Sequence, residues 1–394
     1  MNSGDPTGFG LAPTTYYKGL RTTGATAYLS DPPNNLTILA DSFVSRVLFD
    51  DSKTAVGVET VSGKTYRATK EVILSAGALV SPKILLLSGV GPAAELSTFS
   101  IPSVHDLPSV GKNMIDQSAP YPLLSWHLIS PEFVILTRSS CYSTTTLLLK
   151  PKVEVGTQEV EPIAADPLQA VGAQCPMAWL SSPAVKSSQE FLALPKETQS
   201  FLEKVPSFEL ITTNVPIGVG VYEKLAPDSQ VITFIAAVMN PQGTGSITLS
   251  SNNPSEPPKI DVGYVSHPYD RRVAIEALRT AVEYSKMPTF AAITEKRIEG
   301  PAIDNDEDMF EHVKKSMSPV FHYSGTCKMG RDGDEKTVVN KSFKVQGVKG
   351  LRVADNSVAP LMINNHTQST AYLIVSLVPF LQLYFEKIIL NRAK

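Results

Sequence analysis

Histidines with small and polar neighbours are the residues of this sequence best suited to acid–base chemistry. They occur in three stretches, at residues 266–268 (SHP), 321–327 (FHYSGTC) and 364–367 (NNHT). Imidazole is the side chain that accepts a proton near neutral pH. His322 and His366 each follow an apolar segment and lie in loop-like surroundings, where catalytic groups are commonly held. A histidine in such a place can also be a hydrogen-bonded structural residue, so residue type alone leaves both roles open.

Other catalytic and ligand-binding patterns are missing from the sequence. No group of His, Cys, Asp and Glu residues has the spacing of a metal site, so we expect no bound metal. The cysteines lie far apart and predict neither a disulfide framework nor a CxxC pair; they are Cys141, Cys175 and Cys327. There is no nucleophile elbow and no P-loop. Three GxG triplets lack the rest of a dinucleotide fingerprint, and we interpret them as turns; they lie at residues 8–10, 89–91 and 218–220.

Length and charge limit the classes of protein and partner. The chain has 394 residues, of which 42% are hydrophobic and 19% charged, as in a globular protein. That length corresponds to roughly two or three domains. With 35 Lys and Arg against 38 Asp and Glu, the formal net charge is −3, so we expect no nucleic acid and no anionic membrane surface as partner. The polar, glycine-rich residues 1–20 predict no secretory signal in the chain as it stands, and the cellular location stays open.

The tail of the chain is the one segment with membrane-like composition. Residues 371–390 are interrupted by Ser376, Pro379, Gln382 and the Glu386-Lys387 pair. These interruptions leave no stretch of the roughly 18 apolar residues that a membrane span needs. We therefore expect a buried, proline-kinked core helix here rather than a membrane anchor.

The first hundred residues predict alternating strands and helices. Apolar and polar residues alternate over 35–49, and residues 55–60 and 65–68 supply neighbouring strands through a turn at 62–64. Residues 71–78 predict a short buried strand that ends in small residues.

Three helices and a further sheet are predicted beyond this strand. Ser81-Pro82 is expected to open a helix, with proline in its favoured first turn and Gly89 at its end. Residues 110–301 predict an antiparallel sheet with long connections. One helix in that region starts with Asp270 as its cap, and a second spans residues 306–316.

Five segments resemble, in order, the glucose–methanol–choline (GMC) flavoprotein oxidoreductases. Residues 71–92, EVILSAGALVSPKILLLSGVGP, are similar to the family's second signature. Four further segments match; they lie within residues 2–29, 110–116, 245–270 and 322–366. Gln117 stands where the family usually has histidine. The matches extend over almost the whole chain, so the sequence is identified as a member of this family, and its motifs most resemble those of fungal members.

The resemblance implies a mixed fold class, α/β with α+β character. It implies an incomplete Rossmann-like FAD/NAD(P)-binding domain together with an antiparallel-sheet substrate domain. The FAD-binding part would comprise residues 1–115 and 317–394, and the substrate-binding part would comprise residues 116–316.

The resemblance also implies the chemistry. Family members oxidise an alcohol by passing a hydride from the carbinol carbon to flavin N5 while a base takes the hydroxyl proton. His322 matches the family's first catalytic position and is expected to be the base. His366 matches the second position, and would orient the alcohol oxygen or share the role of base.

For the FAD cofactor, the resemblance implies contacts in three places. Val44 matches a strand position whose backbone meets the adenine. Asp355 and Asn356 match a turn beside the ribityl and pyrophosphate portion, although Asp355 is equally suited to capping a turn. Thr367 and Gln368 open the last helix, where backbone N–H groups could face flavin or phosphate.

One part of the family pattern is missing. Relatives begin with a βαβ unit that carries GxGxxG and holds the ADP half of FAD. The sequence starts beyond that unit, and we expect it to be an incomplete, N-terminally truncated sequence of a longer, ordinary enzyme. The alternative is that the protein itself lacks the unit, and a partner chain could then supply it.

The leading hypothesis is therefore an FAD-dependent alcohol dehydrogenase or oxidase acting on a small-molecule alcohol, in fungal secondary metabolism. A second hypothesis is a non-redox lyase or cyclase that uses the same histidines as acid and base. A third is a non-catalytic remnant that binds no FAD.

Overall fold

The computed structural model describes residues 6–11, 15–17, 20–119, 143–149, 176–213 and 231–378. The chain divides into two compact units, each assembled from separate stretches. Unit 1 comprises residues 1–27, 117–242 and 264–321, and unit 2 comprises residues 28–116, 243–263 and 322–394. Every residue that we predict to be catalytic or cofactor-binding belongs to unit 2. The assignment of residues 1–115 and 317–394 to FAD, and of 116–316 to substrate, stays a prediction.

Unit 1 is built on an antiparallel sheet, as the sequence of the middle region predicts. Its strands run in the order β1-β12-β13-β14-β10-β18, and β11 joins β14 to β17. Every pairing is antiparallel. The strands are β1 Gly8–Leu11, β10 Ser118–Ala119, β11 Ser143–Leu149, β12 Pro176–Leu180, β13 Phe208–Thr213, β14 Val231–Val238, β17 Thr294–Glu299 and β18 Ser318–Pro319.

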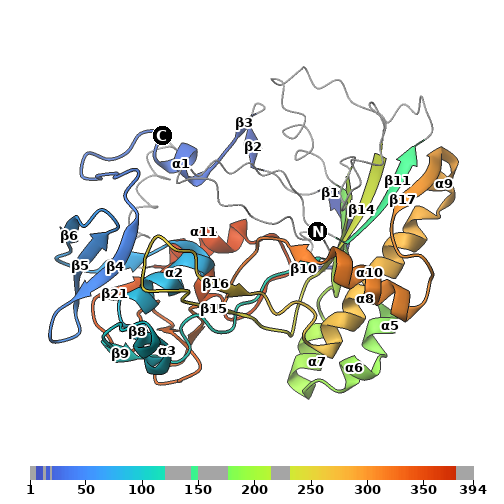
Figure 1. Cartoon of the computed structure of the whole chain (residues 1–394). Coiled ribbons are helices and arrows are strands. Elements are labelled where there is room, and N and C mark those ends of the chain that lie inside the picture. Colours follow the sequence, from blue (N-terminus) through green and yellow to red (C-terminus); the bar gives the residue numbers. More distant parts are fainter. Residues whose placement is uncertain are drawn as a thin grey trace. The chain divides into compact units, whose positions relative to one another are not determined.

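Helix α8, Pro268–Ser285, packs on this sheet and contacts β14 (Figure 1). The expected Asp270 cap is wrong, because the helix begins earlier: the His267 Nδ1 accepts the Tyr269 N–H at 3.2 Å. Pro268 needs no hydrogen-bond partner at the first helical position, so the chain can enter the helix there. Asp270 is instead buried, and its carboxylate accepts the Gln242 N–H at 2.8 Å. His267 thus has a structural role.

Shorter helices complete the described part of unit 1. Helix α10, Asp306–Ser316, has the predicted bounds, and the Asn305 side chain caps it by accepting the Asp308 N–H at 2.9 Å. The other helices are α5 Pro183–Lys186, α6 Gln189–Leu192, α7 Lys196–Leu202 and α9 Pro288–Ile293.

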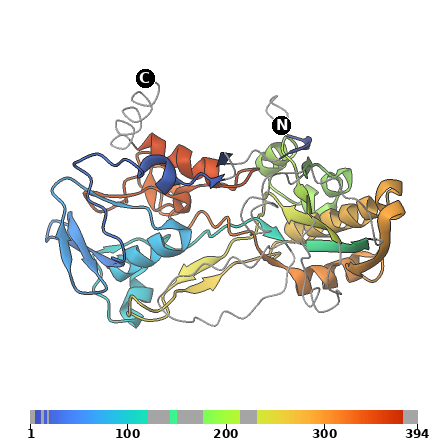
Figure 2. The ribbon, with the colours of Figure 1, turned by 90° about the horizontal axis from the view of Figure 1, so that it is seen from above.

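Unit 2 combines a three-stranded antiparallel sheet with a parallel strand pair and a helix. Strands β4 Val44–Phe49, β5 Ala55–Thr60 and β6 Thr65–Arg67 form the sheet. Figures 1 and 2 show it in blue beside helix α2, Gly77–Leu87. Strand β7, Val72–Leu74, enters α2 and pairs in parallel with β21, Leu351–Val353.

The remaining elements of unit 2 are short. They are β8 Val90–Gly91, α3 Ala93–Thr98, β9 His105–Asp106, β15 Ser246–Thr248, β16 Lys259–Asp261, β19 Met329–Gly330, β20 Val339–Asn340, the 3-10 turn η2 Asn356–Val358 and α11 Gln368–Leu377. Strands β2 Tyr16–Tyr17 and β3 Leu20–Arg21 belong to unit 1, and α1 Gly24–Tyr28 ends at the first residue of unit 2. One hydrophobic core joins β7, β21, α2 and the loops between them.

Two predicted elements of unit 2 have different limits. The strand expected over 35–49 forms only over Val44–Phe49, and the apolar side chains of Ile38, Leu39 and Phe43 are exposed. Within the described residues, this first half has no neighbouring strand to pair with, so alternation alone does not make it a strand. The helix expected to open at Ser81-Pro82 begins four residues earlier, at Gly77, and Pro82 lies inside it.

Part of the tail and two of the cysteines lie outside the described residues. Helix α11 ends at Leu377, and residues 379–390 of the predicted helix lie outside the described residues. Within α11 only Ile374 is buried, and Leu373 and Leu377 are exposed, so the expectation of a buried core helix is wrong for this part. Cys141 and Cys175 also lie outside them, whereas Cys327 is fully buried. Among the helices that the structure describes, none is long and apolar enough to cross a membrane.

Candidate active site

Two histidines that are distant in sequence meet in unit 2. The imidazole rings of His322 and His366 lie edge to face, with centroids 4.8 Å apart and planes inclined by 77°. His322 follows β18, and His366 lies two residues before α11. The structure therefore brings together the two residues that the sequence analysis singles out as candidate acid–base groups.

The backbone around His322 is held from both sides. Its N–H donates to the Asp116 Oδ1 at 2.8 Å, and its carbonyl accepts the Ser324 hydroxyl at 2.9 Å. Ser324 also exchanges two backbone hydrogen bonds with Ile115, at 2.9 and 3.0 Å. Asp116 is not among the predicted site residues; its place in the matched segment 110–116 is the only sequence signal for it.

Burial decides the charge of His322. Removal from water, together with the nearby His366 ring, lowers the pKa of His322 from 6.5 to about 3. The ring is therefore neutral at physiological pH, and a neutral imidazole has a nitrogen that can accept a proton. The arrangement suits a base more than a positively charged group.

Asp355 connects this region to the start of helix α2. Its Oδ2 accepts the Gly77 N–H at 2.9 Å and the Ser81 hydroxyl at 2.6 Å, and its Oδ1 accepts the Ser357 N–H at 2.8 Å. A carboxylate is favoured at a helix N-terminus, where backbone N–H groups and the helix dipole are positive. The hydrogen bonds made by the Asp355 side chain thus serve the fold, as the capping alternative predicts.

Two amide oxygens in the same unit are buried without a partner. In the part of the chain that the structure describes, neither the Asn356 Oδ1 nor the Asn364 Oδ1 accepts a hydrogen bond. A buried acceptor left unpaired costs about 1–3 kcal/mol, so such atoms indicate sites for a donor. The hydroxyl groups of a ribityl chain are donors of this kind, so the hydrogen-bonding chemistry of these two residues fits FAD. Asn356 is a cofactor contact predicted from the sequence, whereas Asn364 is not among the predicted site residues.

The other predicted cofactor residues lie in two different elements. Thr367 is buried at the cap position of α11, where its side chain makes no capping hydrogen bond, and Gln368 is the exposed first residue of that helix. Val44 is half-buried at the start of β4, opposite Thr60. Their roles toward FAD stay predictions.

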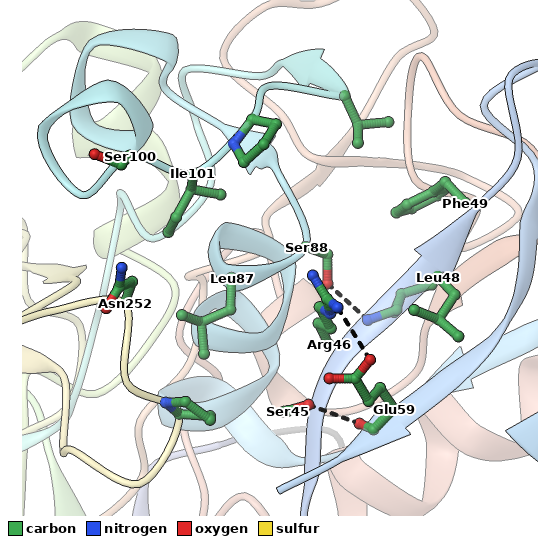
Figure 3. Close-up of a pocket in the computed structure, with 14 residues that line it drawn as sticks. Ser45, Arg46, Leu48, Phe49, Glu59, Leu87, Ser88, Ser100, Ile101 and Asn252 are labelled. Atoms are coloured by element: carbon green, nitrogen blue, oxygen red, sulfur yellow. Dashed lines mark hydrogen bonds and ion pairs between the residues drawn. The ribbon is translucent and has the colours of Figure 1, made fainter. Parts of the chain in front are cut away.

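A cavity of about 500 Å³ lies elsewhere in unit 2, between β4, the end of α2 and residues 99–104 (Figure 3). Its polar groups are engaged: the Ser88 Oγ accepts the Val47 N–H at 2.8 Å, and Arg46 pairs with Glu59 at 3.0 Å. None of the predicted catalytic or cofactor residues lines it. We therefore do not assign it to the histidine site. Among the described residues there is also no group of three metal-ligating side chains.

Comparison with known proteins gives one family over most of the chain. Two family models, both described as GMC oxidoreductase, match residues 1–119 and 241–374. The chain is 29% identical to "Dehydrogenase pkfF" of Emericella nidulans over 95% of its own length and 60% of that protein. It is 31% identical to "Glucose methanol choline oxidoreductase atC" of Aspergillus terreus, over 96% of its length and 60% of the relative. It is 30% identical to "Patulin synthase" of Penicillium expansum, over 87% and 54%.

Two solved structures share the fold of the chain. Pyridoxine 4-oxidase from Mesorbium loti aligns with a TM-score of 0.74 at 21% identity, over 98% of this chain and 66% of the other. A fungal aryl-alcohol oxidase aligns with a TM-score of 0.69 at 24% identity, over 99% and 68%. The chain spans between about half and three fifths of the length of the curated relatives named above.

Proposed function

Because the chain belongs to the GMC oxidoreductase family, we propose that it carries the alcohol-oxidising site of an FAD-dependent oxidoreductase, with His322 as the base. The observation that supports this most is the pairing of His322 with His366 at 4.8 Å, together with the lowered pKa of His322. A neutral imidazole next to a second one provides the two polar side chains that alcohol oxidation requires.

The proton is handled by the chain's own residues. An imidazole nitrogen of His322 accepts the proton of the substrate hydroxyl, and His366 orients the alcohol oxygen or shares the proton. The carbinol carbon loses a hydride, so the alcohol becomes an aldehyde or ketone. FAD, when bound, supplies the acceptor for that hydride.

We propose that the cofactor is held by residues on either side of β21 and α11. The unpaired Asn356 and Asn364 oxygens accept from its hydroxyl groups, and the start of α11 at Thr367 and Gln368 offers backbone N–H groups. Val44 remains the proposed adenine contact. Asp355 keeps the start of α2 in place next to them.

The proposed substrate class is an aromatic alcohol. A fungal aryl-alcohol oxidase is among the structures of similar fold, and two fungal relatives are named as synthases, "Patulin synthase" and "Versicolorin B synthase". A role in fungal secondary metabolism is also part of the proposal, and the names of these two relatives support it.

The test is anaerobic flavin reduction by the full chain purified with FAD. Benzyl-type alcohols should bleach the flavin absorbance of the wild type. His322→Gln should slow the bleaching by about 10²–10⁴-fold, as expected for the loss of a general base, and should leave flavin binding intact. His105→Gln, in the same unit but outside the histidine pair, is the matched control and should reduce flavin at the wild-type rate.

The other hypotheses predict different results. A non-redox lyase or cyclase would convert a substrate without bleaching the flavin, and His322→Gln would still slow it. A remnant would bind no flavin at all. Equal rates of bleaching in wild type and His322→Gln would refute the assignment of His322 as base.

A further inference from the structure

We propose that Asp116 is a positioning residue for His322, fixing the backbone of the residue that carries the proposed base. This inference rests on the proposed function for its catalytic meaning. The position of His322 itself can be measured without any turnover.

The contact between Asp116 and His322 is short and shielded from water. The Asp116 side chain is 2% exposed, and its Oδ1 accepts the His322 N–H at 2.8 Å. Hydrogen bonds to a carboxylate are stronger than neutral ones, and a water-excluded setting strengthens them further. The partner is the main chain of His322, so the carboxylate fixes where the imidazole is attached.

Ser324 and Ile115 hold the backbone on the other side of His322. The Ser324 hydroxyl donates to the His322 carbonyl, and the backbone of Ser324 pairs with Ile115. Both main-chain groups of His322 therefore have partners, the N–H in Asp116 and the carbonyl in Ser324. These hydrogen bonds restrain the backbone from which the imidazole extends.

The residue before His322 supports a positioning role. Phe321 has a φ of +60°, in the left-handed region that a bulky aromatic residue rarely adopts. Its side chain is 49% exposed, so burial gives little compensation for this conformation. Such strained residues persist when neighbouring contacts over-determine them, and they gather at functional sites. The Asp116 hydrogen bond holds the peptide that follows Phe321 and so helps to fix this conformation.

A purely structural carboxylate in unit 1 offers a matched control. Asp270 is 1% exposed and accepts a backbone N–H, that of Gln242, at 2.8 Å. The two carboxylates share burial and type of partner, but only Asp116 binds the residue proposed as base. Asp116→Ala and Asp270→Ala therefore separate positioning of His322 from general stabilisation.

The experiment uses the full chain with FAD, labelled with [15N]histidine. The six histidines give few amide signals, and His322→Gln assigns the one from His322. We expect Asp116→Ala to shift that signal and to speed its hydrogen exchange, whereas Asp270→Ala leaves it unchanged. Asp116→Asn keeps an oxygen acceptor and should restore the signal. With a benzyl-type alcohol, Asp116→Ala should lower kcat about 10²-fold at unchanged KM, the cost of a misplaced catalytic group, and Asp116→Asn should recover most of it.

The two proposals fail in different ways. An unchanged His322 amide signal in Asp116→Ala overturns the positioning role, whatever happens to turnover. A shifted signal with wild-type kcat overturns its catalytic importance. If the wild type oxidises no alcohol but the signal responds as expected, the proposed function fails and the positioning of His322 by Asp116 stands.

Discussion

The hydroxyl of Thr326 donates a 2.6 Å hydrogen bond to the backbone carbonyl of Ala78, and both residues are buried. The carbonyl of Ala78 would normally accept the N–H of the residue four positions on, which here is Pro82. Proline has no N–H, so the helix leaves this carbonyl without its usual donor. Thr326, in the segment that follows His322, supplies the missing hydrogen bond and so connects helix α2 to the candidate site.

Thr326→Val should therefore destabilise the chain. It leaves the buried Ala78 carbonyl unpaired, at a cost of about 1–3 kcal/mol in free energy of unfolding. Thr326→Ser keeps the hydroxyl and should cost less. The measurement is urea unfolding followed by circular dichroism.

Pro82→Ala provides a sharper version of this test, because it returns an N–H to the helix. In a double-mutant cycle, Thr326→Val should cost less in the Pro82→Ala background than in the wild type. Equal costs in both backgrounds would show that the threonine hydroxyl does not replace the proline's missing donor.

This hydrogen bond explains why the sequence misplaces the start of α2. Local preference puts proline in the first turn of a helix, and that preference predicts a start at Ser81-Pro82. The stabilising partner, Thr326, is far away in the chain, and no local pattern contains it. The strand predicted over residues 35–43 does not form for a related reason. Alternation of apolar and polar residues gives a strand only where a neighbouring strand pairs with it.

Patterns that depend on local chemistry are predicted well. Helix α10 has the expected bounds because acidic residues at its start, Asp306 among them, and lysines at its end match the helix dipole. His322 and His366 are found through residue type and family resemblance, whereas their 4.8 Å contact requires the folded chain. Asp116 and Asn364 are not predicted as site residues, because neither lies in a distinctive local pattern. Only their burial and hydrogen bonding in the folded chain identify them.

Replacing Asp355 with alanine should affect both stability and flavin binding. The change leaves three donors without their acceptor, those of Gly77, Ser81 and Ser357. We expect a loss of about 2–4 kcal/mol in the free energy of unfolding and weaker FAD binding, measured by urea unfolding and by flavin titration. Ser81→Ala removes one of these donors, and with it the hydroxyl that accepts the Ala76 N–H at 3.1 Å, and should cost about 1–2 kcal/mol. Equal losses for the two variants would contradict a central role for the carboxylate.

The lowered pKa of His322 predicts how stability depends on pH. The folded pKa is about 3 and the unfolded value is 6.5, so between these values the unfolded chain binds more protons. As far as His322 is concerned, the free energy of unfolding should keep its full value above pH 6.5 and decrease as the pH falls toward 3. His322→Gln should flatten this dependence, which unfolding measured across the same pH window would reveal.

The same shift predicts the pH profile of turnover. A base that stays neutral down to about pH 3 does not lose its acceptor below pH 6.5, so kcat/KM of the chain should show no acid limb at the ordinary histidine pKa from this residue. An acid limb near pH 6.5 that disappears in His322→Gln would contradict the neutral, desolvated histidine.

Gly325 should be far less tolerant of a side chain than Gly333. Both have positive φ, +83° and +77°, so alanine costs about 1–2 kcal/mol at either position from backbone strain alone. A Cβ at Gly333 meets nothing within 4 Å, whereas at Gly325 it would lie 2.4 Å from the carbonyl oxygen of Asn113. That oxygen belongs to the stretch that continues into Ile115 and Asp116, so relief of the clash must move the support of His322.

Gly325→Ala is therefore expected to lose about 2–5 kcal/mol, the strain plus about 1–3 kcal/mol for overpacking. Gly333→Ala should lose only the about 1–2 kcal/mol of backbone strain and keep the wild-type rate of flavin reduction. Urea unfolding measures the stability of both variants, and anaerobic flavin reduction measures their function. If the two glycines responded alike in both measurements, the close approach of residues 113 and 325 would have no part in holding His322, since strain is the only property that the two positions share.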